Sequence, residues 1–296
     1  MGGEVVGKAM LKAVFGSRLR FFLPFAALLA VLIPSQAQIL DGQTLVSARL
    51  VPSKTAVVPG QPFEVGLLLE MAPGWHTYWE YSGDAGLPTK IAWTLPAGFE
   101  SGPIQWPAPH LMIEPGEIWT YGYGGKVLLI TTVVPPADLP AGKMVTLRAK
   151  ASWLACKDMC IPGSAELELQ LPVAATSAGA NDALFNEFRS RIPSASPPPF
   201  VLNWSNTGGA WNLSIPNLPA GAKAGLFPLP PSDQSVGHPA ESGPGQFRIE
   251  MQGAFRGVLA VGEGADTKAW IVESTAPAAA PKQGLWLALF LSLIHI

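Results

Sequence analysis

The only two cysteines of this 296-residue chain, Cys156 and Cys160, lie four positions apart. A disulfide requires Cα atoms within about 4.4–6.8 Å of each other. On one extended strand, residues four apart are separated by about 13 Å. The pair can therefore close only if residues 157–159 form a tight turn, with the cysteines facing each other at the end of a hairpin.

Alternating sequences on both sides of the pair support this hairpin. In residues 145–155 the odd positions are apolar and the even positions are largely polar, which is the period of two expected of a half-buried strand. Residues 166–171 alternate in the same way after Pro162 and Gly163. The pattern predicts two antiparallel strands. Cys156 falls among the even, polar positions, so we expect both sulfurs to lie near the solvent side of a sheet edge.

The size of the closed loop bears on whether the pair is a structural staple or a redox centre. In the chain-entropy model a five-residue loop contributes about 2 kcal/mol, against roughly 3 kcal/mol for fifteen residues. A domain of well over a hundred residues builds its own core and has little need of so small a contribution. The spacing therefore favours redox chemistry, with a structural disulfide as the alternative.

The N-terminus resembles a secretory signal. Basic residues precede the apolar stretch 21–33, and Ser35-Gln36-Ala37 fits the small-x-small rule for cleavage. We interpret residues 1–37 as a signal peptide and expect the mature chain to begin near Gln38 in an oxidising, exported compartment; an uncleaved anchor is the alternative. Without the signal, 15 Lys and Arg face 20 Asp and Glu, a net charge near −5. This charge argues against nucleic acid or an anionic membrane surface as a partner.

The C-terminal residues 284–296 are apolar and carry no formal charge, and they follow a Pro/Ala-rich linker at 276–281. A membrane-spanning helix needs about 20 residues. We therefore expect residues 276–296 to be a linker and the start of a transmembrane segment that continues beyond this sequence.

Between these ends we expect an all-β chain of two modules. Residues 38–175 contain both cysteines and alternating runs typical of a β-sandwich, residues 176–199 contain one short helix and a Pro-rich linker, and residues 200–275 form a smaller β-rich module. The predicted helix, residues 181–191, begins at a cap-like Asn181 or Asp182. The second module has no cysteine, so we assign it a scaffold or docking role. The predicted strands are 63–70, 91–95, 126–134, 145–155, 166–171, 211–215, 247–251, 257–261 and 269–273.

Four stretches of the first module resemble the N-terminal periplasmic domain of the thiol:disulfide interchange protein DsbD family. The likeness is greatest to the ScsB-type branch associated with copper tolerance. The four stretches occur in order between residues 40 and 175. They are Gly-Trp-His-Thr-Tyr-Trp at 74–79 with Gly-Asp-Ala-Gly-Leu-Pro at 83–88, Ile-Gln-Trp-Pro-Ala-Pro at 104–109, Tyr-Gly-Tyr at 121–123, and Trp-Leu-Ala-Cys-Lys-Asp-Met-Cys-Ile-Pro at 153–162.

The resemblance implies an immunoglobulin-like fold and protein-disulfide reductase activity as part of a larger protein. Cys156 and Cys160 would cycle between dithiol and disulfide without a cofactor. They would receive electrons from a membrane domain of the same family and pass them to exported thioredoxin-like proteins, which places the module in the periplasm. Family members shield the cysteines with an aromatic cap, for which Trp119 or Tyr121 is the candidate here. The best-known enterobacterial members have a wider cysteine spacing, so the conformation of the loop stays open.

Two other functions compete with this one. Six tryptophans of the first module could stack sugars in a carbohydrate-binding sandwich, although such residues more often pack a core. Copper or zinc could bind the two thiols together with His76 or His110. Hydrolase and nucleotide-binding motifs are absent from the sequence, and we expect Asp84 and Glu117 to be capping or solvated carboxylates. The six tryptophans are Trp75, Trp79, Trp93, Trp106, Trp119 and Trp153.

Overall fold

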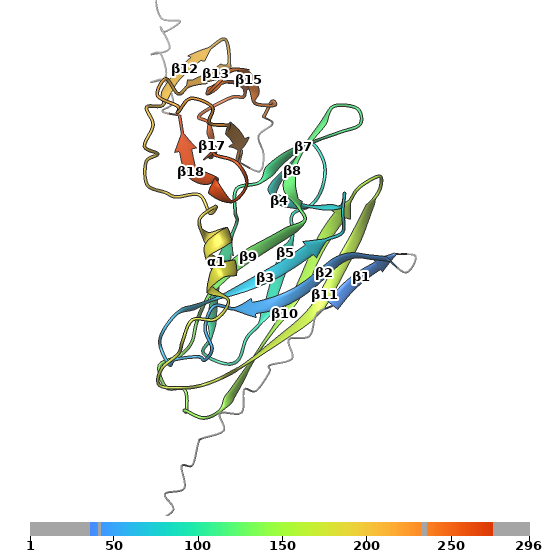
Figure 1. Ribbon diagram of the computed structural model, residues 1–296, viewed down its shortest axis with the longest axis vertical. Helices are drawn as coiled ribbons and strands as arrows, with labels where there is room; N and C mark the ends of the chain where they lie inside the picture. The colour runs from blue at the N-terminus through green and yellow to red at the C-terminus, as the bar shows by residue number, and fades with distance from the viewer. Residues whose placement is uncertain (1–35, 41–42, 232–235, 275–296) are drawn as a thin grey trace, which may run out of the picture. The chain divides into compact units, whose positions relative to one another are not determined.

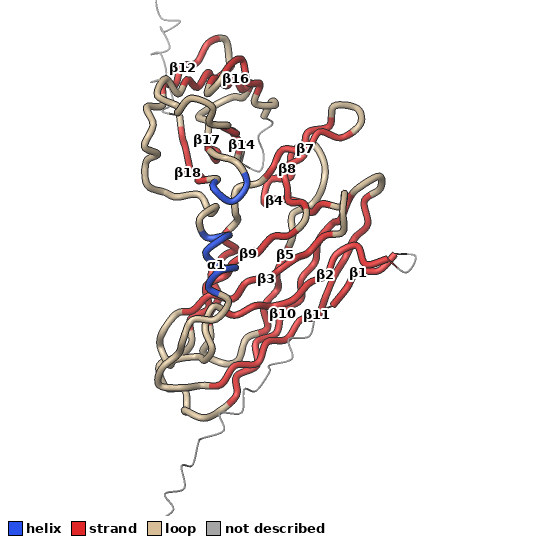
Figure 2. The backbone as a smooth tube through the Cα atoms, viewed as in Figure 1, coloured by secondary structure: helices blue, strands red, loops and turns tan. Residues whose placement is uncertain are grey.

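The computed structural model describes residues 36–40, 43–231 and 236–274. The expected signal peptide, apart from its last two residues, and the expected membrane segment lie outside the described residues. Within the described part of the chain, no helix is long and apolar enough to span a membrane. Figure 2 shows strands and loops with little helix; the helical elements described are α1 (Asp182–Arg189) and a short 3-10 turn, η1 (Gly264–Asp266).

The first module is a sandwich of two antiparallel sheets. One sheet has the order β1-β2-β3-β9-β6, and Figure 1 shows β2, β3 and β9 side by side. The other has the order β11-β10-β4-β8-β7, with β5 pairing with β10. The bounds are β1 (Gln36–Leu40), β2 (Gln43–Pro52), β3 (Phe63–Met71), β4 (His76–Gly83), β5 (Lys90–Thr94), β6 (Glu100–Gln105), β7 (His110–Glu114), β8 (Ile118–Gly124), β9 (Lys126–Val134), β10 (Met144–Cys156) and β11 (Cys160–Pro172).

The core of this sandwich lies between the sheets and extends under the helix. On β3 and β9, neighbouring residues of both parities are buried, for example Leu128 and Leu129. Phe185 and Phe188 of α1 belong to the same buried cluster, and the Lys126 ammonium lies over the Phe188 ring. The sheet that contains β3 and β9 therefore has buried residues on both faces, and residues 127–131 of β9 are all buried.

The chain crosses from one sheet to the other at Gly125. This glycine has a φ of 68°, in the left-handed region that residues with a Cβ rarely adopt. It separates β8 from β9, which belong to different sheets. A single glycine thus lets two consecutive strands contribute to both layers of the sandwich.

The tryptophans of the first module are packing residues. Trp79 and Trp153 are buried, and Trp75, Trp93 and Trp106 are partly buried against the core. Trp119 is half-buried and stacks on a histidine ring. None of the six is an exposed platform, so the structure offers no support for a sugar-binding face built from them.

The second module also consists of two small antiparallel sheets. Their orders are β12-β13-β16-β15 and β14-β17-β18. The module has its own core around Trp211, Phe247 and Phe255. Buried residues of β14, β17 and β18, including Phe227 and Val258, belong to the core of the first sandwich. The bounds are β12 (Asn203–Thr207), β13 (Ala210–Ser214), β14 (Ala224–Pro228), β15 (Ala240–Gly243), β16 (Gln246–Glu250), β17 (Arg256–Val261) and β18 (Lys268–Glu273).

The expected all-β fold is confirmed, and the predicted strands agree with the observed ones. Residues 126–134 are β9 itself, and 145–155 lie within β10. The expected helix is shorter at both ends, and Asn181, one of the two expected cap residues, lies at the N-cap position. Asn181 occupies the cap position without a side-chain capping bond, because its amide donates instead to the Pro52 carbonyl at 2.9 Å.

Candidate functional site

The cysteine pair lies at the end of the longest hairpin of the structure's described part. β10 and β11 are 13 residues each and pair without a register shift from Met144↔Pro172 to Cys156↔Cys160. Residues 157–159 form the turn, in which the Lys157 amide donates to the Met159 carbonyl at 3.3 Å. Cys156 and Cys160 are joined by a disulfide. The hairpin predicted from the spacing is therefore confirmed.

The two sulfur-bearing residues differ in exposure. Cys156 is 1% exposed, whereas Cys160 is exposed. The expectation that both sulfurs face solvent is wrong for Cys156, because β4 pairs with β10 at this point and places His76 directly opposite Cys156. An approaching molecule can therefore reach the disulfide from the Cys160 side only.

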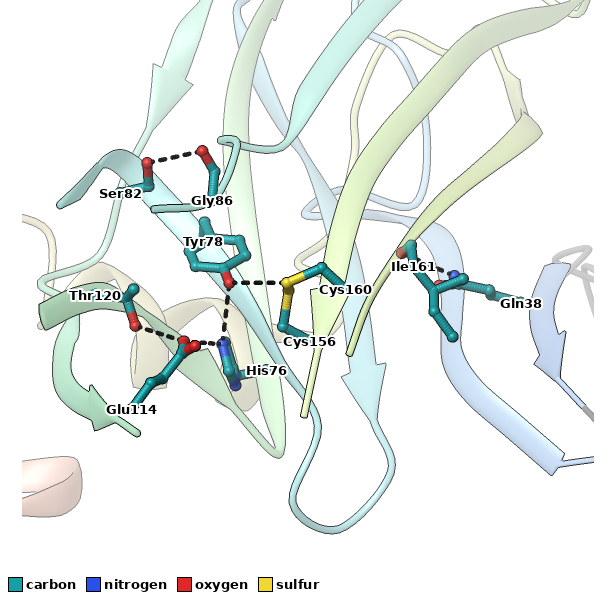
Figure 3. Close-up of a disulfide and its surroundings, with 10 residues drawn as sticks. All are labelled: Gln38, His76, Tyr78, Ser82, Gly86, Glu114, Thr120, Cys156, Cys160 and Ile161. Carbon is teal, nitrogen blue, oxygen red and sulfur yellow. Dashed lines mark hydrogen bonds and ion pairs between the residues drawn. A yellow bond between two sulfur atoms is a disulfide. The ribbon is translucent and has the colours of Figure 1, made fainter. Parts of the chain in front are cut away.

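A buried polar chain begins at the exposed cysteine (Figure 3). The Tyr78 hydroxyl lies 3.7 Å from Cys160 Sγ and 3.4 Å from His76 Nε2. His76 Nε2 lies 3.3 Å from Glu114 Oε1, which accepts a hydrogen bond from Thr120 Oγ1 at 3.1 Å. Side chains from β4, β7 and β8 thus converge on the end of the β10–β11 hairpin.

Burial determines the protonation states of Tyr78 and His76 in this polar network. Desolvation raises the pKa of Tyr78 to about 12, and the charge of Glu114 adds to the rise. The pKa of His76 is lowered by desolvation, which outweighs the opposing charge and hydrogen bond of Glu114. At neutral pH, Tyr78 is therefore protonated and His76 is neutral.

The lowered pKa of His76 predicts a pH-dependent stability. As the pH falls below the ordinary histidine value of about 6.5, the unfolded chain takes up a proton that the folded chain resists, so the free energy of unfolding decreases. One such group contributes a slope of at most about 1.4 kcal/mol per pH unit. Urea unfolding between about pH 7.5 and about pH 5.5 measures this slope. His76→Gln should flatten it, and an unchanged slope would contradict the assignment to His76.

A glycine turn holds Tyr78 in place. Gly86 has a φ of 98°, and a Cβ at this position would lie 2.3 Å from the Tyr78 ring. The Ser82 hydroxyl donates to the Gly86 carbonyl at 3.1 Å and fixes the turn. Only glycine allows the backbone to approach the ring this closely, which gives the Gly-Asp-Ala-Gly-Leu-Pro stretch a structural reason.

Gln38 connects β1 to the same hairpin. Its side-chain amide donates to the carbonyls of Ile161 and Pro162 at 3.2 and 3.1 Å. Its side-chain oxygen accepts a hydrogen bond from Trp153 Nε1 at 2.8 Å. The strand at the expected start of the mature chain thus supports the hairpin just behind the cysteines.

The ring contacts of the two candidate cap residues, Trp119 and Tyr121, lie on the face of β8 opposite to Thr120 and Glu114. Trp119 stacks on His238 of the second module with ring centroids 4.6 Å apart. Tyr121 packs against the rings of Tyr81 and Phe227. Because side chains alternate along a strand, Thr120 points to Glu114 while its two neighbours point the other way. The cap role of Trp119 and Tyr121 stays a prediction.

Asp84, Glu117 and His110, the other ionisable residues considered in the sequence analysis, lie outside the cysteine site. Asp84 accepts a hydrogen bond from the Trp119 amide at 2.8 Å and pairs with His238 at 2.8 Å. Glu117 is exposed, in a turn with a φ of 60°. His110 Nε2 lies 3.1 Å from the Arg191 guanidinium. Among the described residues, no group of three or more His, Cys, Asp or Glu has a metal-binding arrangement.

Sequence reasoning missed Tyr78 and Glu114 and treated His76 only as a packing residue or metal ligand. One signal was available, since His76 and Tyr78 are two apart and therefore share a face of β4. Glu114 could not be found in this way, because β7 reaches the site only through the pairing of β7 with β8 and of β8 with β4.

The fold and the site together define a class of protein: a β-sandwich with a redox-capable cysteine pair at an exposed hairpin end. Residues 47–172 match the family described as thiol:disulfide interchange protein DsbD, N-terminal. Residues 47–172 are thus similar to that family, and the match supports a thiol-disulfide exchange domain with a cysteine pair.

One solved structure supports the fold. The N-terminal periplasmic domain of ScsB from Proteus mirabilis superimposes with a TM-score of 0.58 at 16% identity, covering 81% of this chain and 98% of that chain. The likeness confirms the immunoglobulin-like sandwich. The E. coli chaperone DraB overlaps with a TM-score of only 0.24 at 11% identity, over 78% of this chain and 100% of that one. No curated protein sequence matches the chain.

Proposed function

We propose that this chain is the exported electron-transfer module of a membrane-bound thiol:disulfide interchange protein. Its dithiol at Cys156 and Cys160 would take electrons from a membrane domain of the same family and pass them to exported thioredoxin-like proteins in the periplasm. The observation that carries this proposal is the disulfide itself, which joins the only two cysteines at an exposed hairpin end in a domain that matches this family.

The exposure of the two residues supports Cys160 as the attacking residue. Cys160 is exposed, whereas Cys156 is 1% exposed. A partner's disulfide must approach the nucleophilic sulfur in line, so access decides which cysteine reacts first. In the proposed reaction the Cys160 thiolate forms the mixed disulfide, and Cys156 resolves it.

Thiol trapping tests the exchange directly. The protein is reduced, freed of reductant and mixed with an oxidised thioredoxin-fold protein, and samples are quenched with a maleimide that adds mass to each free thiol. We expect two thiols to disappear from this chain as two appear in the partner. The matched control is the variant with both cysteines replaced by serine. Transfer no faster than with this control would contradict the proposal.

A further inference from the structure

The site contains a polar arrangement that simple disulfide chemistry does not require. Three ionisable side chains, Tyr78, His76 and Glu114, form a continuous chain that ends at the exposed sulfur. Tyr78 is 1% exposed, and His76 is also buried. Burying such groups costs free energy unless their hydrogen bonds compensate it, so their position next to the reactive sulfur calls for an explanation.

The direction of the hydrogen bonds follows from the chemistry of the disulfide. A disulfide sulfur has no hydrogen, so Tyr78 must be the donor to Cys160 Sγ. The Tyr78 oxygen is then free to accept from His76 Nε2–H, which also faces the Glu114 carboxylate. The Tyr78 hydroxyl therefore donates toward the sulfur, and Figure 3 shows its contacts with Cys160 and His76.

A hydrogen bond donated by Tyr78 stabilises the Cys160 thiolate of the reduced protein more than the disulfide sulfur of the oxidised protein. A disulfide sulfur is a weak acceptor, whereas a thiolate accepts a charge-assisted hydrogen bond of about twice the strength of a neutral one. The donor is thus already in place where negative charge appears when the disulfide is reduced. Preorganised donors of this kind need no rearrangement when the charge forms.

We propose that Tyr78 is a catalytic hydrogen-bond donor to the Cys160 thiolate and that His76 and Glu114 are the positioning residues that orient and polarise it. This inference rests on the proposed function and adds to it the group that activates the nucleophile. Gly86, whose hydrogen atom leaves room for the Tyr78 ring, secures the geometry.

The step that Tyr78 assists conserves atoms and electrons. The Cys160 thiol loses its proton to solvent, and the thiolate attacks one sulfur of the partner's disulfide. A new S–S bond forms as the partner's own S–S bond breaks, and the partner's second sulfur leaves as a thiolate and takes up a proton. Cys156 then loses its proton to solvent, and its thiolate attacks Cys160 Sγ. The Cys156–Cys160 disulfide forms as the mixed disulfide breaks, and the first partner sulfur leaves as a thiolate and takes up a proton. This chain is oxidised by two electrons, and the partner is reduced by two.

The charges around the chain set the expected pH dependence. His76 faces Glu114 on β7, Tyr78 on β4 and the cysteines on β10 and β11. Protonation of His76 adds a positive charge that favours the Cys160 thiolate, whereas the Glu114 charge opposes it. Lys157 and Asp158 in the turn are charges of opposite sign. Tyr78, with its raised pKa, stays protonated and remains a donor throughout the neutral range.

The experiment measures the pKa of Cys160 alone. In a Cys156→Ser background, the rate of alkylation by iodoacetamide is followed against pH, since the thiolate is the reactive form. We expect Tyr78→Phe to raise the pKa of Cys160 by about one unit, which reduces alkylation at neutral pH about tenfold. Tyr81→Phe in the same background is the matched control, because Tyr81 packs against Tyr121 instead, and it should leave the pKa unchanged.

His76→Gln gives a second readout that a purely structural role would not change. With His76 present, the alkylation rate should fall less than tenfold per pH unit in the acidic range, because protonated His76 stabilises the thiolate. With Gln at this position, the full tenfold slope should return. Should Tyr78→Phe fail to fold, this slope decides the question. A Cys160 pKa unaffected by Tyr78→Phe, or an acidic slope unaffected by His76→Gln, would overturn the proposal.

These readouts do not depend on a partner protein. If thiol trapping showed no transfer while Tyr78→Phe still raised the Cys160 pKa, the proposed function would fail and the role of Tyr78 in thiolate stabilisation would stand. If transfer occurred and the pKa did not respond, the proposed function would stand and this inference would fail.

Discussion

Replacing the two cysteines one at a time is expected to give opposite results. Cys160→Ser should reduce electron transfer to a partner's disulfide to the rate of the double serine variant, because the exposed nucleophile is gone and Cys156 is buried. Cys156→Ser should instead leave a long-lived mixed disulfide between Cys160 and the partner, because the resolving thiol is missing. Non-reducing gels and mass spectrometry after mixing with an oxidised thioredoxin-fold protein distinguish the two.

The two variants are controls for each other, since each retains one thiol in the same hairpin and the two positions are only four residues apart. Equal trapping by both variants would contradict the assignment of Cys160 as the attacking residue. Trapping by Cys160→Ser alone would reverse the assignment. Either result would show that the difference in exposure between the two residues does not decide which cysteine attacks the partner's disulfide.

The second large effect concerns stability. Trp79 is 0% exposed and contacts the Phe227 ring edge-on at 6.3 Å between centroids. Trp79→Ala removes a large core side chain and leaves a cavity, so we expect a loss of about 3–5 kcal/mol in the free energy of unfolding. Denaturant unfolding monitored by circular dichroism measures the loss.

Trp119→Ala is the matched control for this change. Trp119 is half-buried and stacks on one ring, so its removal should cost clearly less than the removal of Trp79. Equal losses would contradict the placement of Trp79 in the core. The pair of variants also tests the carbohydrate alternative, because a buried Trp79 cannot stack on a sugar.

The strands that the sequence predicted well are those with one buried face. β10 alternates apolar and polar residues over most of its length, because one side faces the core and the other is more open. Residues 126–134, predicted as one of the alternating runs, are β9 itself. Where local pattern and burial agree, the bounds differ by no more than a residue or two at most ends.

β4 shows why other strands were missed. Its first four residues, His76 to Trp79, are all buried, so the period of two disappears. The Gly86 turn covers Tyr78, and Phe227 of the second module contacts Trp79. Gly86 lies outside the strand and Phe227 is distant in sequence, so the alternation pattern of the strand itself does not contain these contacts.

One part of the candidate site could be predicted from the sequence and the other could not. The spacing of Cys156 and Cys160 determined the hairpin, because no other geometry lets the pair close. The polar chain behind Cys160 depends on the pairing of β4, β8 and β7, which brings Glu114 to His76 across 38 positions of sequence. The sequence alone contains Tyr78, His76 and Glu114 but does not show that the three side chains contact one another.

The reduction potential of the Cys156–Cys160 pair tests the central claim most directly. The protein is equilibrated with glutathione or dithiothreitol buffers of known potential, and its free thiols are counted at each point. Electron transfer to partner proteins predicts a value between roughly −120 and −270 mV, the range of known exchange proteins. A value below about −300 mV would mark a structural disulfide and contradict the proposed function.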